Sequence, residues 1–229
     1  MLDQHITATS NGRDSQVTVI GAPDACPICH HKVVPMVMKA TMDGLVTRDR
    51  LQVAYLCPNR ECGRMFIGIF NTPGGHQQGI FFFEQVLPAT PIVAQFSKEI
   101  RDLSPRFVDV HDDAEAAAAY GLKELEGMGL RKALEFLVKD FAMRGRDEAA
   151  IEMIRPMALA QVIENYCDDA KLKMAAKRAT WLGNDETHYV KRWEEKDVND
   201  LRTLVRITVS WIEREILTEQ FTESMPGPA

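Results

Sequence analysis

The chain has 229 residues, of which 45% are apolar, and its mean hydropathy is −0.20. This composition is typical of a globular protein with one large domain or two small ones. No apolar run approaches the roughly 20 residues that a membrane-spanning helix needs, so we expect no membrane partner.

The net charge of −6 is unevenly distributed. Residues 1–110 carry 10 basic and 10 acidic residues, whereas residues 111–229 carry 17 basic and 23 acidic ones. A surface that coats nucleic acid broadly is therefore not indicated. A local basic site is predicted in KLKMAAKR (171–178), with the solvated face of a helix as the alternative.

The N-terminal sequence MLDQHITATSNGRDS has neither a basic start nor an apolar core, so no signal peptide is predicted. We expect a cytoplasmic location, in which persistent disulfides are unlikely to form.

Residues 15–88 are typical of β-strands, because their apolar runs are rich in Val, Ile, Phe and Tyr. These runs are QVTVIGA, VPMVMKATM, LQVAYLC, MFIGIF and GIFFFEQVL. Turn residues separate them at Asp43-Gly44, at Pro58-Asn59 and in NTPGGHQQG. The pattern predicts a small antiparallel β module within residues 1–90.

Two cysteine pairs fall at the ends of these strands: Cys26 with Cys29, and Cys57 with Cys62. Each pair opens on a Cys-Pro step, and 27 residues separate the two pairs. Two short-spaced pairs can place four thiolates around one tetrahedral zinc ion. The spacing predicts a structural zinc ribbon, with the metal supplying stability that so small a core cannot.

These cysteines have two alternative uses. One is a pair of disulfides, which the expected cytoplasmic location disfavours. The other is a catalytic zinc in which His30, His31 or His76 replaces one sulfur, but four sulfurs leave no open coordination position. The fifth cysteine, Cys167, lies in the apolar stretch ALAQVIENYCDD and is predicted to be a small buried hydrophobic residue.

After LPATP (87–91) the pattern becomes helical, and residues 91–222 are predicted to form an all-α domain. Ser104-Pro105 is typical of a helix start, and Asp197 of the N-cap of the last helix. Gly127 and Gly129 predict a kink or a close helix contact. The first expected helix starts at residue 104, and the others cover residues 121–143, 157–167, 169–182 and 198–220. Residues 223–229 are expected to form a disordered tail. The fold class is thus α+β.

The segment RATWLGNDETHYVKRW (178–193) is not explained by helical periodicity. Leu182-Gly183 is typical of a helix end, and Asn184 of the cap of a new turn. His188 lies four residues after Asn184 and so on the same side of that turn.

Three segments, LSPRFVDVHDDAEAAAAYGL, GMGLRKALEFLVKDF and WLGNDETHYVKRWEEKD, resemble domain-of-unknown-function family 4145. The resemblance covers about residues 95–220, and RKALEFLVKD and LGNDETH are its most specific parts. It implies a cysteine-pair ribbon followed by a helical bundle related to HEPN domains. Those domains occur in bacterial toxins, anti-phage systems and RNA-processing proteins. A homodimer through the helical domain and an RNA or protein partner are therefore expected.

The resemblance also implies candidate catalytic residues. HEPN ribonucleases use a paired Arg-x4–6-His motif at a dimer interface, often with Asn directly after the Arg. Asn184 and His188 match the Asn and the His, whereas Gly183 stands at the Arg position. Cutting RNA through its 2′-hydroxyl needs both a proton-transfer group and a cation. Because Gly183 cannot supply that cation, Arg178, Lys191 and Arg192 are the candidates to replace it.

Two functions of different classes follow. One is a zinc-binding interaction or nucleic-acid-associated protein of bacterial or phage conflict systems, with a HEPN-like helical domain that binds RNA. If it is instead a non-catalytic module that binds a protein partner, His188 and Asp185 form a structural corner. The alternative is a metal-independent ribonuclease that uses His188. A third hypothesis, hydrolysis at a metal held by Asp185, Glu186 and His188, lacks a second cluster of carboxylates and histidines.

Overall fold

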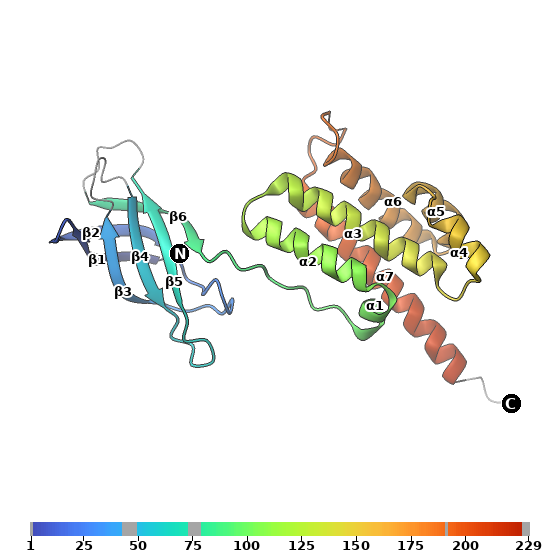
Figure 1. Ribbon diagram of the computed structural model, residues 1–229, viewed down its shortest axis with the longest axis horizontal. Helices are drawn as coiled ribbons and strands as arrows, with labels where there is room; N and C mark the ends of the chain where they lie inside the picture. The colour runs from blue at the N-terminus through green and yellow to red at the C-terminus, as the bar shows by residue number, and fades with distance from the viewer. Residues whose placement is uncertain (1, 43–49, 73–78, 191, 226–229) are drawn as a thin grey trace. The chain divides into compact units, whose positions relative to one another are not determined.

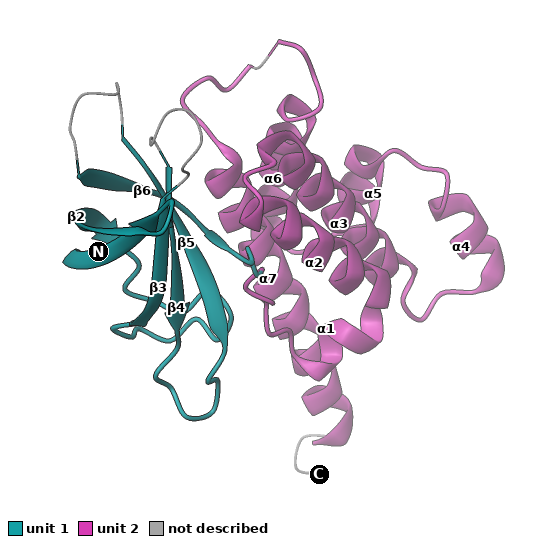
Figure 2. Cartoon of the chain, turned by 60° about the vertical axis from the view of Figure 1, so that its left-hand side comes forward, with its two compact units in different colours: residues 1–90 teal, residues 91–229 magenta. Residues whose placement is uncertain are grey.

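The computed structural model describes residues 2–42, 50–72, 79–190 and 192–225. The chain divides into two compact units, residues 1–90 and 91–229 (Figure 2). The first unit consists of strands and the second of helices. Among the described residues, no helix has the length and apolar character that crossing a membrane requires.

The first unit is a closed barrel of six strands (Figure 1). Around the barrel the strands follow the order β1-β2-β6-β5-β4-β3. Most neighbours are antiparallel, but β1 pairs with β3, and β2 with β6, in parallel. The strands are β1 (Leu2–Ser10), β2 (Arg13–Ala22), β3 (Met36–Met42), β4 (Arg50–Leu56), β5 (Met65–Asn71) and β6 (Ile80–Leu87).

The predicted fold of this unit, a small antiparallel zinc ribbon, is therefore wrong. The sequence prediction began the strands at residue 15 and so omitted β1. In the structure β1 pairs with β2 through the Asn11-Gly12 turn and with β3 at Ala8 and Ala40. This extra strand closes the sheet, and closure removes the exposed edges that a small open sheet would present.

The interior of the barrel is filled by alternating side chains from every strand, including Val53 and Tyr55 of β4 and Phe66 and Phe70 of β5. Gly68 sits between those two phenylalanines. A β-carbon at Gly68 would lie 2.9 Å from ring carbons of both Tyr55 and Phe70. The glycine is required because the two rings occupy the space that a side chain would need.

Gly68→Ala is expected to destabilise the barrel by about 1–3 kcal/mol, because overpacking forces buried rings off their preferred positions. Urea unfolding of the barrel would measure the loss. The double variant Gly68→Ala/Phe70→Leu tests the cause, because the smaller side chain makes room for the methyl group. Its cost should be less than the sum of the two single costs. Simple additivity would contradict the steric explanation.

The second unit is a helical bundle. Its helices are α1 (Lys98–Leu103), α2 (Pro105–Ala119), α3 (Lys123–Met143), α4 (Glu148–Ile154), α5 (Leu159–Tyr166), α6 (Ala170–Asp185) and α7 (Val198–Ser224). Leucines and alanines of α3 lie in the middle of the core, against apolar faces of α5, α6 and α7. The short helices α1 and α4 were not predicted.

Two predicted helix starts are confirmed. Ser104 caps α2 by accepting a hydrogen bond from the Phe107 backbone. Asp197 caps α7 in a capping box with Asp200. The predicted helix end at Gly183 is wrong, because α6 continues to Asp185.

Glycines allow α3 to approach its neighbours closely. A β-carbon at Gly129 would lie 2.8 Å from the Ala114 side chain of α2, and one at Gly127 would lie 2.7 Å from that of Glu186. A β-carbon at Gly183 would lie 2.5 Å from the Arg131 side chain, which crosses over α6 at this point. The predicted close helix contact at Gly127 and Gly129 is thus observed, and Gly183 belongs to the same interface.

A buried ionic cluster joins α2, α3 and α7. Arg202 of α7 donates to Glu126 of α3 at 2.6 Å and pairs with Glu115 of α2. His111 Nε2 lies 3.7 Å from the same Glu115 carboxylate. Burial lowers the pKa of His111 to about 4, so the imidazole is neutral at pH 7. The cluster fixes the position of α7 on the bundle.

Candidate metal centre and exposed corner of the helical unit

The four predicted ligands converge at one end of the barrel. Their sulfur atoms all lie within 4.8 Å of one another. Cys26 Sγ is 3.9 Å from Cys62 Sγ, and Cys29 Sγ is 3.9 Å from Cys57 Sγ. Four cysteines in this arrangement could hold a metal ion.

The first cysteine pair lies in a turn that follows β2. The turn is closed by a bridge between Ala25 and Lys32 and by a hydrogen bond of 3.0 Å from Cys26 N to His31 O. His30 adopts a left-handed conformation with φ 59°, which reverses the chain after Cys29. Ile28 N lies 3.4 Å from Cys26 Sγ and donates to it. This backbone geometry directs both sulfurs to the same side of the turn.

The second pair lies between β4 and β5. Cys57 N donates to Arg64 O at 3.0 Å, and Cys62 N donates to Asn59 O at 2.9 Å. Gly63, with φ 55°, provides the left-handed residue that leads into β5. The Asn59 amide also donates to Cys29 Sγ of the first pair at 3.9 Å. The two turns therefore contact each other directly.

The sulfurs are farther apart than in a disulfide, and two of their distances match the spacing around a tetrahedral metal. A disulfide requires sulfurs about 2.0 Å apart, and all four cysteines are free thiols. Zinc–sulfur bonds of about 2.3 Å in a tetrahedron place neighbouring sulfurs about 3.8 Å apart, close to the observed 3.9 Å.

Histidine ligation is not indicated by the described residues. His30 is exposed, and His31 Nδ1 lies 3.0 Å from Cys29 O. His76 lies outside the described residues. Only the four cysteines form a group of three or more close metal ligands in the described part of the chain. The donor set is thus four sulfurs.

The pKa values of the cysteine thiols differ because their surroundings differ. Burial raises the pKa of the Cys57 thiol to about 12 and also raises that of Cys26. Hydrogen bonding from the His31 backbone lowers the pKa of Cys29 to about 6. A bound cation would offset the cost of holding buried thiolates, because it favours their charged form.

The second candidate site is the corner formed by residues 181–193. The buried Asp185 carboxylate accepts hydrogen bonds from Arg192 N at 2.9 Å and Trp193 N at 2.8 Å. The loop after α6 is thereby folded back on the helix end. The His188 side chain, which the structural-corner hypothesis paired with Asp185, is exposed and has no hydrogen-bond partner within the described ranges.

Arg131, which was not among the predicted site residues, contacts this corner. Arg131 Nε of α3 donates to Asn184 Oδ1 at 3.0 Å, and its Nη1 donates to Glu135 at 3.3 Å. Gly183 makes the approach possible because it has no side chain in the path of Arg131. Arg131 lies in the RKALEFLVKD segment, but no linear motif connects it to Asn184, which is 53 residues away.

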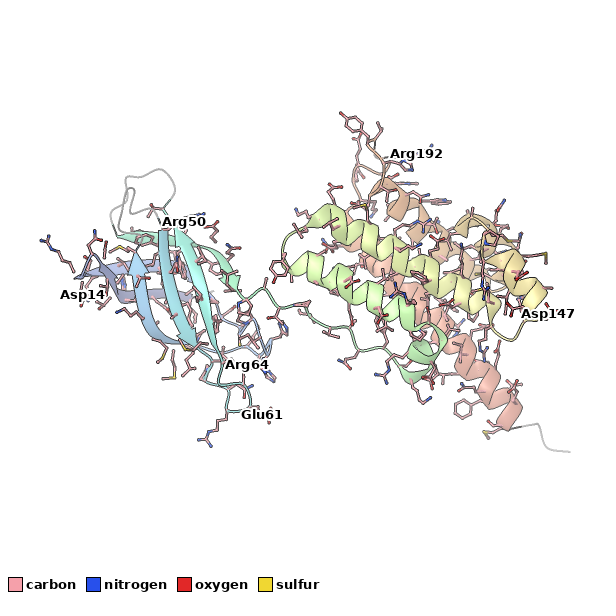
Figure 3. The ribbon with its side chains drawn as sticks, in the orientation of Figure 1. Asp14, Arg50, Glu61, Arg64, Asp147 and Arg192 are labelled. Carbon is pink, nitrogen blue, oxygen red and sulfur yellow. The ribbon has the colours of Figure 1, made fainter. Side chains whose placement is uncertain are left out.

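Exposed aromatic side chains surround the corner. The Trp181 and Trp193 rings are nearly parallel, with an interplanar angle of 10° and centroids 6.3 Å apart. Their exposed fractions are 46% and 47%. With Asn184, His188 and Arg192 they line a cavity of about 880 Å³, and Figure 3 shows Arg192 at the outer surface of this corner.

Basic residues outnumber acidic ones in the segment that contains the corner, although Glu164 pairs with Lys173 and Lys177, and the exposed Glu194 and Glu195 follow Trp193. Residues 171–193 contain six basic and two acidic residues. Both acidic residues, Asp185 and Glu186, are buried. Lys171, Met174, Arg178 and Trp181 are exposed at helical spacing on one face of α6. Lys191 lies outside the described residues.

The proposed metal site at Asp185, Glu186 and His188 does not form. Asp185 is occupied by two backbone N–H groups, Glu186 packs on Gly127, and His188 is exposed.

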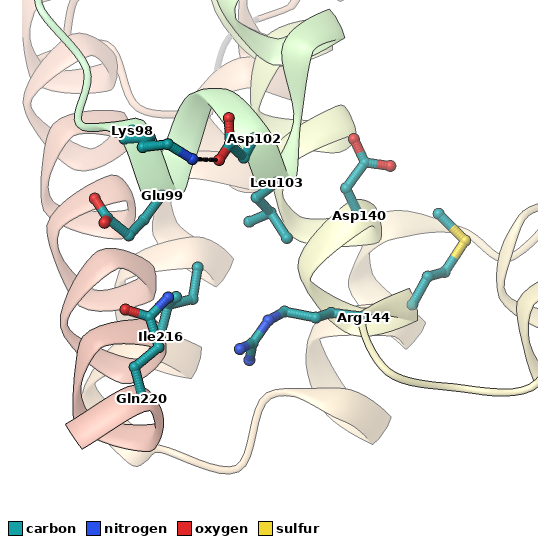
Figure 4. A pocket seen from close by; sticks show the side chains of 9 residues that line it. Lys98, Glu99, Asp102, Leu103, Asp140, Arg144, Ile216 and Gln220 are labelled. Atoms are coloured by element: carbon teal, nitrogen blue, oxygen red, sulfur yellow. Dashed lines mark hydrogen bonds and ion pairs between the residues drawn. The ribbon is translucent and has the colours of Figure 1, made fainter. Parts of the chain in front are cut away.

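A further cavity of about 470 Å³ lies where α1, α3 and α7 meet (Figure 4). Two ion pairs involve its lining residues, Lys98 with Asp102 and Arg144 with Glu219. Asp140 accepts a hydrogen bond from the Ser104 hydroxyl at 2.5 Å. The described residues that line the cavity include no cysteine, serine or histidine, and its carboxylates are those of Glu99, Asp102 and Asp140.

Comparisons with known protein families, curated proteins and solved structures find no match to this chain. The candidate sites therefore rest on their own geometry.

Proposed function

We propose that this protein is a zinc-stabilised, nucleic-acid-associated protein whose helical unit binds single-stranded RNA. The observation that carries the proposal is the pair of half-exposed, nearly parallel tryptophans within the basic 171–193 segment. Proteins that hold single strands combine aromatic stacking platforms with a cationic surface that follows the phosphates. The corner of the helical unit offers both.

Zinc is the proposed metal because four thiolates at tetrahedral spacing suit zinc and leave no open position for a substrate. Its role is structural. It would join the turn after β2 to the turn after β4, and so hold together the end of a barrel whose core is small.

Cys62→Ser is expected to release zinc and destabilise the barrel, because one thiolate of four is lost. The wild-type protein should carry about one zinc per chain by elemental analysis. The matched control is Cys167→Ala, which removes a buried cysteine of the helical unit and should leave the zinc content unchanged. Wild-type protein purified without chelator and containing no zinc would contradict the assignment.

The RNA proposal depends on local charge, not on net charge. Arg178 is exposed one turn before Trp181, and Arg192 lines the same cavity as both tryptophans. Each base stacked on an aromatic side chain contributes about 1–3 kcal/mol to binding. The basic groups would add a salt-dependent attraction to phosphate.

Trp193→Ala is expected to weaken binding of a single-stranded RNA 12-mer by about tenfold or more, because a stacking surface is lost. Arg178→Ala should weaken binding of different sequences equally and reduce the salt dependence by about one counterion. Fluorescence anisotropy at several salt concentrations measures both effects. Tyr120→Ala, an exposed aromatic residue of the same unit, is the control. If wild-type protein binds no RNA at low salt, the corner is instead a protein-binding or purely structural feature.

A metal-independent ribonuclease is the second candidate function. The observation that favours it is the hydrogen bond between Arg131 and Asn184. This contact brings an arginine to the segment in which Gly183 replaced the expected one. His188 would accept the proton of the 2′-hydroxyl as that oxygen bonds to the phosphorus, and would give a proton to the 5′-oxygen when its bond to phosphorus breaks. Arg131 would stabilise charge on the phosphate after exchanging its contact with Glu135.

His188→Ala is expected to abolish RNA cleavage while leaving RNA binding and the melting temperature nearly unchanged. The side chain is exposed, so its loss leaves no buried group unpaired. Gel analysis of a labelled RNA in the presence of EDTA measures cleavage. Wild-type protein that binds RNA without cutting it, or cleavage that survives in the variant, would exclude this mechanism.

A further inference from the structure

A cavity of about 490 Å³, here named the His111 cavity, lies within the helical unit. Its lining residues come from α2, from α7 and from residues 92–97, which lead into α1. This volume is within the range of small-molecule binding sites, which is about 300–1,000 Å³. Part of the lining is apolar and consists of Ile92, Ala94, Phe96, Val205 and Val209.

His111 of α2 lines this cavity and is only 7% exposed. Its Nδ1 atom is buried and has no hydrogen-bond partner among the described residues. Buried polar atoms of native proteins nearly always have a partner, because an unpaired one costs free energy. Since His111 lines a cavity, a molecule bound there could supply the missing partner.

The protonation of His111 determines what that partner must be. Burial, together with the nearby charge of Arg202, lowers the pKa of His111 to about 4, so the imidazole is neutral at pH 7. Its Nε2 lies 3.7 Å from the carboxylate of Glu115, which favours the proton on Nε2 because a carboxylate only accepts. Nδ1 is then a hydrogen-bond acceptor, and the bound molecule must donate an N–H or O–H group.

The apolar side chains near this acceptor suit a flat ring. Phe96 meets the His111 ring at an interplanar angle of 90°, with the centroids 5.0 Å apart. A ring that carries an N–H group could contact the apolar side chains and still donate to Nδ1.

The charges of the lining are balanced. Two basic residues, Arg202 and Arg206, and two acidic ones, Glu115 and Glu213, line the cavity. Arg202 pairs with Glu115, whereas Arg206 and Glu213 have no ion-pair partner within the described ranges. A lining with balanced charges favours an uncharged ligand. The unpaired guanidinium and carboxylate remain available to bind polar groups such as hydroxyls.

We propose that the His111 cavity is a second binding site of this protein and that its ligand is an uncharged nucleoside. A nucleoside combines a flat ring that donates N–H groups, several hydroxyl groups and the absence of charge. Its base would donate to His111 Nδ1, and its ribose hydroxyls would bind Arg206 and Glu213. The site is independent of the proposed RNA binding, because it shares no lining residue with the cavity at Trp181 and Trp193.

Isothermal titration calorimetry of the full chain with adenosine, guanosine, cytidine and uridine tests the proposal. At least one of the four is expected to bind with a dissociation constant on the order of 0.1 mM, as is typical of a ligand of this size. The 5′-monophosphate of the same nucleoside should bind more weakly. If none of the four binds at millimolar concentration, the proposal is wrong and Nδ1 is left to a water molecule. Tighter binding of the monophosphate would overturn the assignment of an uncharged ligand.

Substitutions at His111 test the role of the acceptor. His111→Phe keeps a ring but removes Nδ1, and it should weaken nucleoside binding about tenfold or more, because the ligand N–H loses its partner. His111→Asn carries an oxygen near the position of Nδ1 and should recover part of the affinity. Equal affinity of the wild type and a folded His111→Phe chain would exclude the proposed hydrogen bond.

A substitution at an exposed position tests the location without disturbing the core. Thr203 is an exposed residue of α7 that lines the cavity. Thr203→Trp should block the cavity and abolish nucleoside binding, with the melting temperature and the RNA affinity unchanged. The matched control is Thr222→Trp, at an exposed position of α7 outside the cavity, which should bind like the wild type. Nucleoside binding that survives in Thr203→Trp would place the ligand elsewhere and overturn the proposal.

Discussion

The convergence of four cysteine sulfurs at one end of the barrel is the constraint on which the rest of the first unit depends. The two turns that carry them lie between β2 and β3 and between β4 and β5. Fixing those turns to each other fixes the ends of four of the six strands. Strands β4 and β5 adjoin the second turn directly, since β4 ends at Leu56 just before Cys57 and β5 begins at Met65 just after Arg64. The same two turns therefore carry the candidate metal ligands and hold the ends of strands that form the barrel core.

In the second unit the corresponding constraint is close helix packing around α3. Glycines at 127, 129 and 183 bring α2 and α6 close to it, and the buried Arg202 cluster holds α7. A buried ion pair contributes little net stability, because desolvation of the charges offsets their attraction. The Arg202 side chain, which is 32% exposed, links α7 to Glu115 of α2 and Glu126 of α3.

Sequence patterns predicted those structural features that depend on residues close together in the chain. The cysteine spacing located the four clustered sulfurs, and capping residues located the starts of α2 and α7. They did not predict features that depend on contacts between residues far apart in the chain. Strand β1 was missed although its Asn11-Gly12 turn is a strong hairpin signal, and without β1 a closed barrel could not be predicted. Gly183 was interpreted as a helix end because glycine usually ends helices, whereas here it accommodates a side chain from another helix.

The path of Arg131 over Gly183 has a consequence for how this chain can vary. A β-carbon at position 183 would lie 2.5 Å from the arginine side chain, so the arginine can keep its contact with Asn184 only while position 183 has no side chain. Positions 131 and 183, which are 52 residues apart in the chain, are therefore expected to covary. Among relatives of this protein, a larger residue at 183 should be accompanied by a smaller one at 131. Where both change, Asn184 loses its cationic neighbour, and a chemical role for the corner should disappear with it.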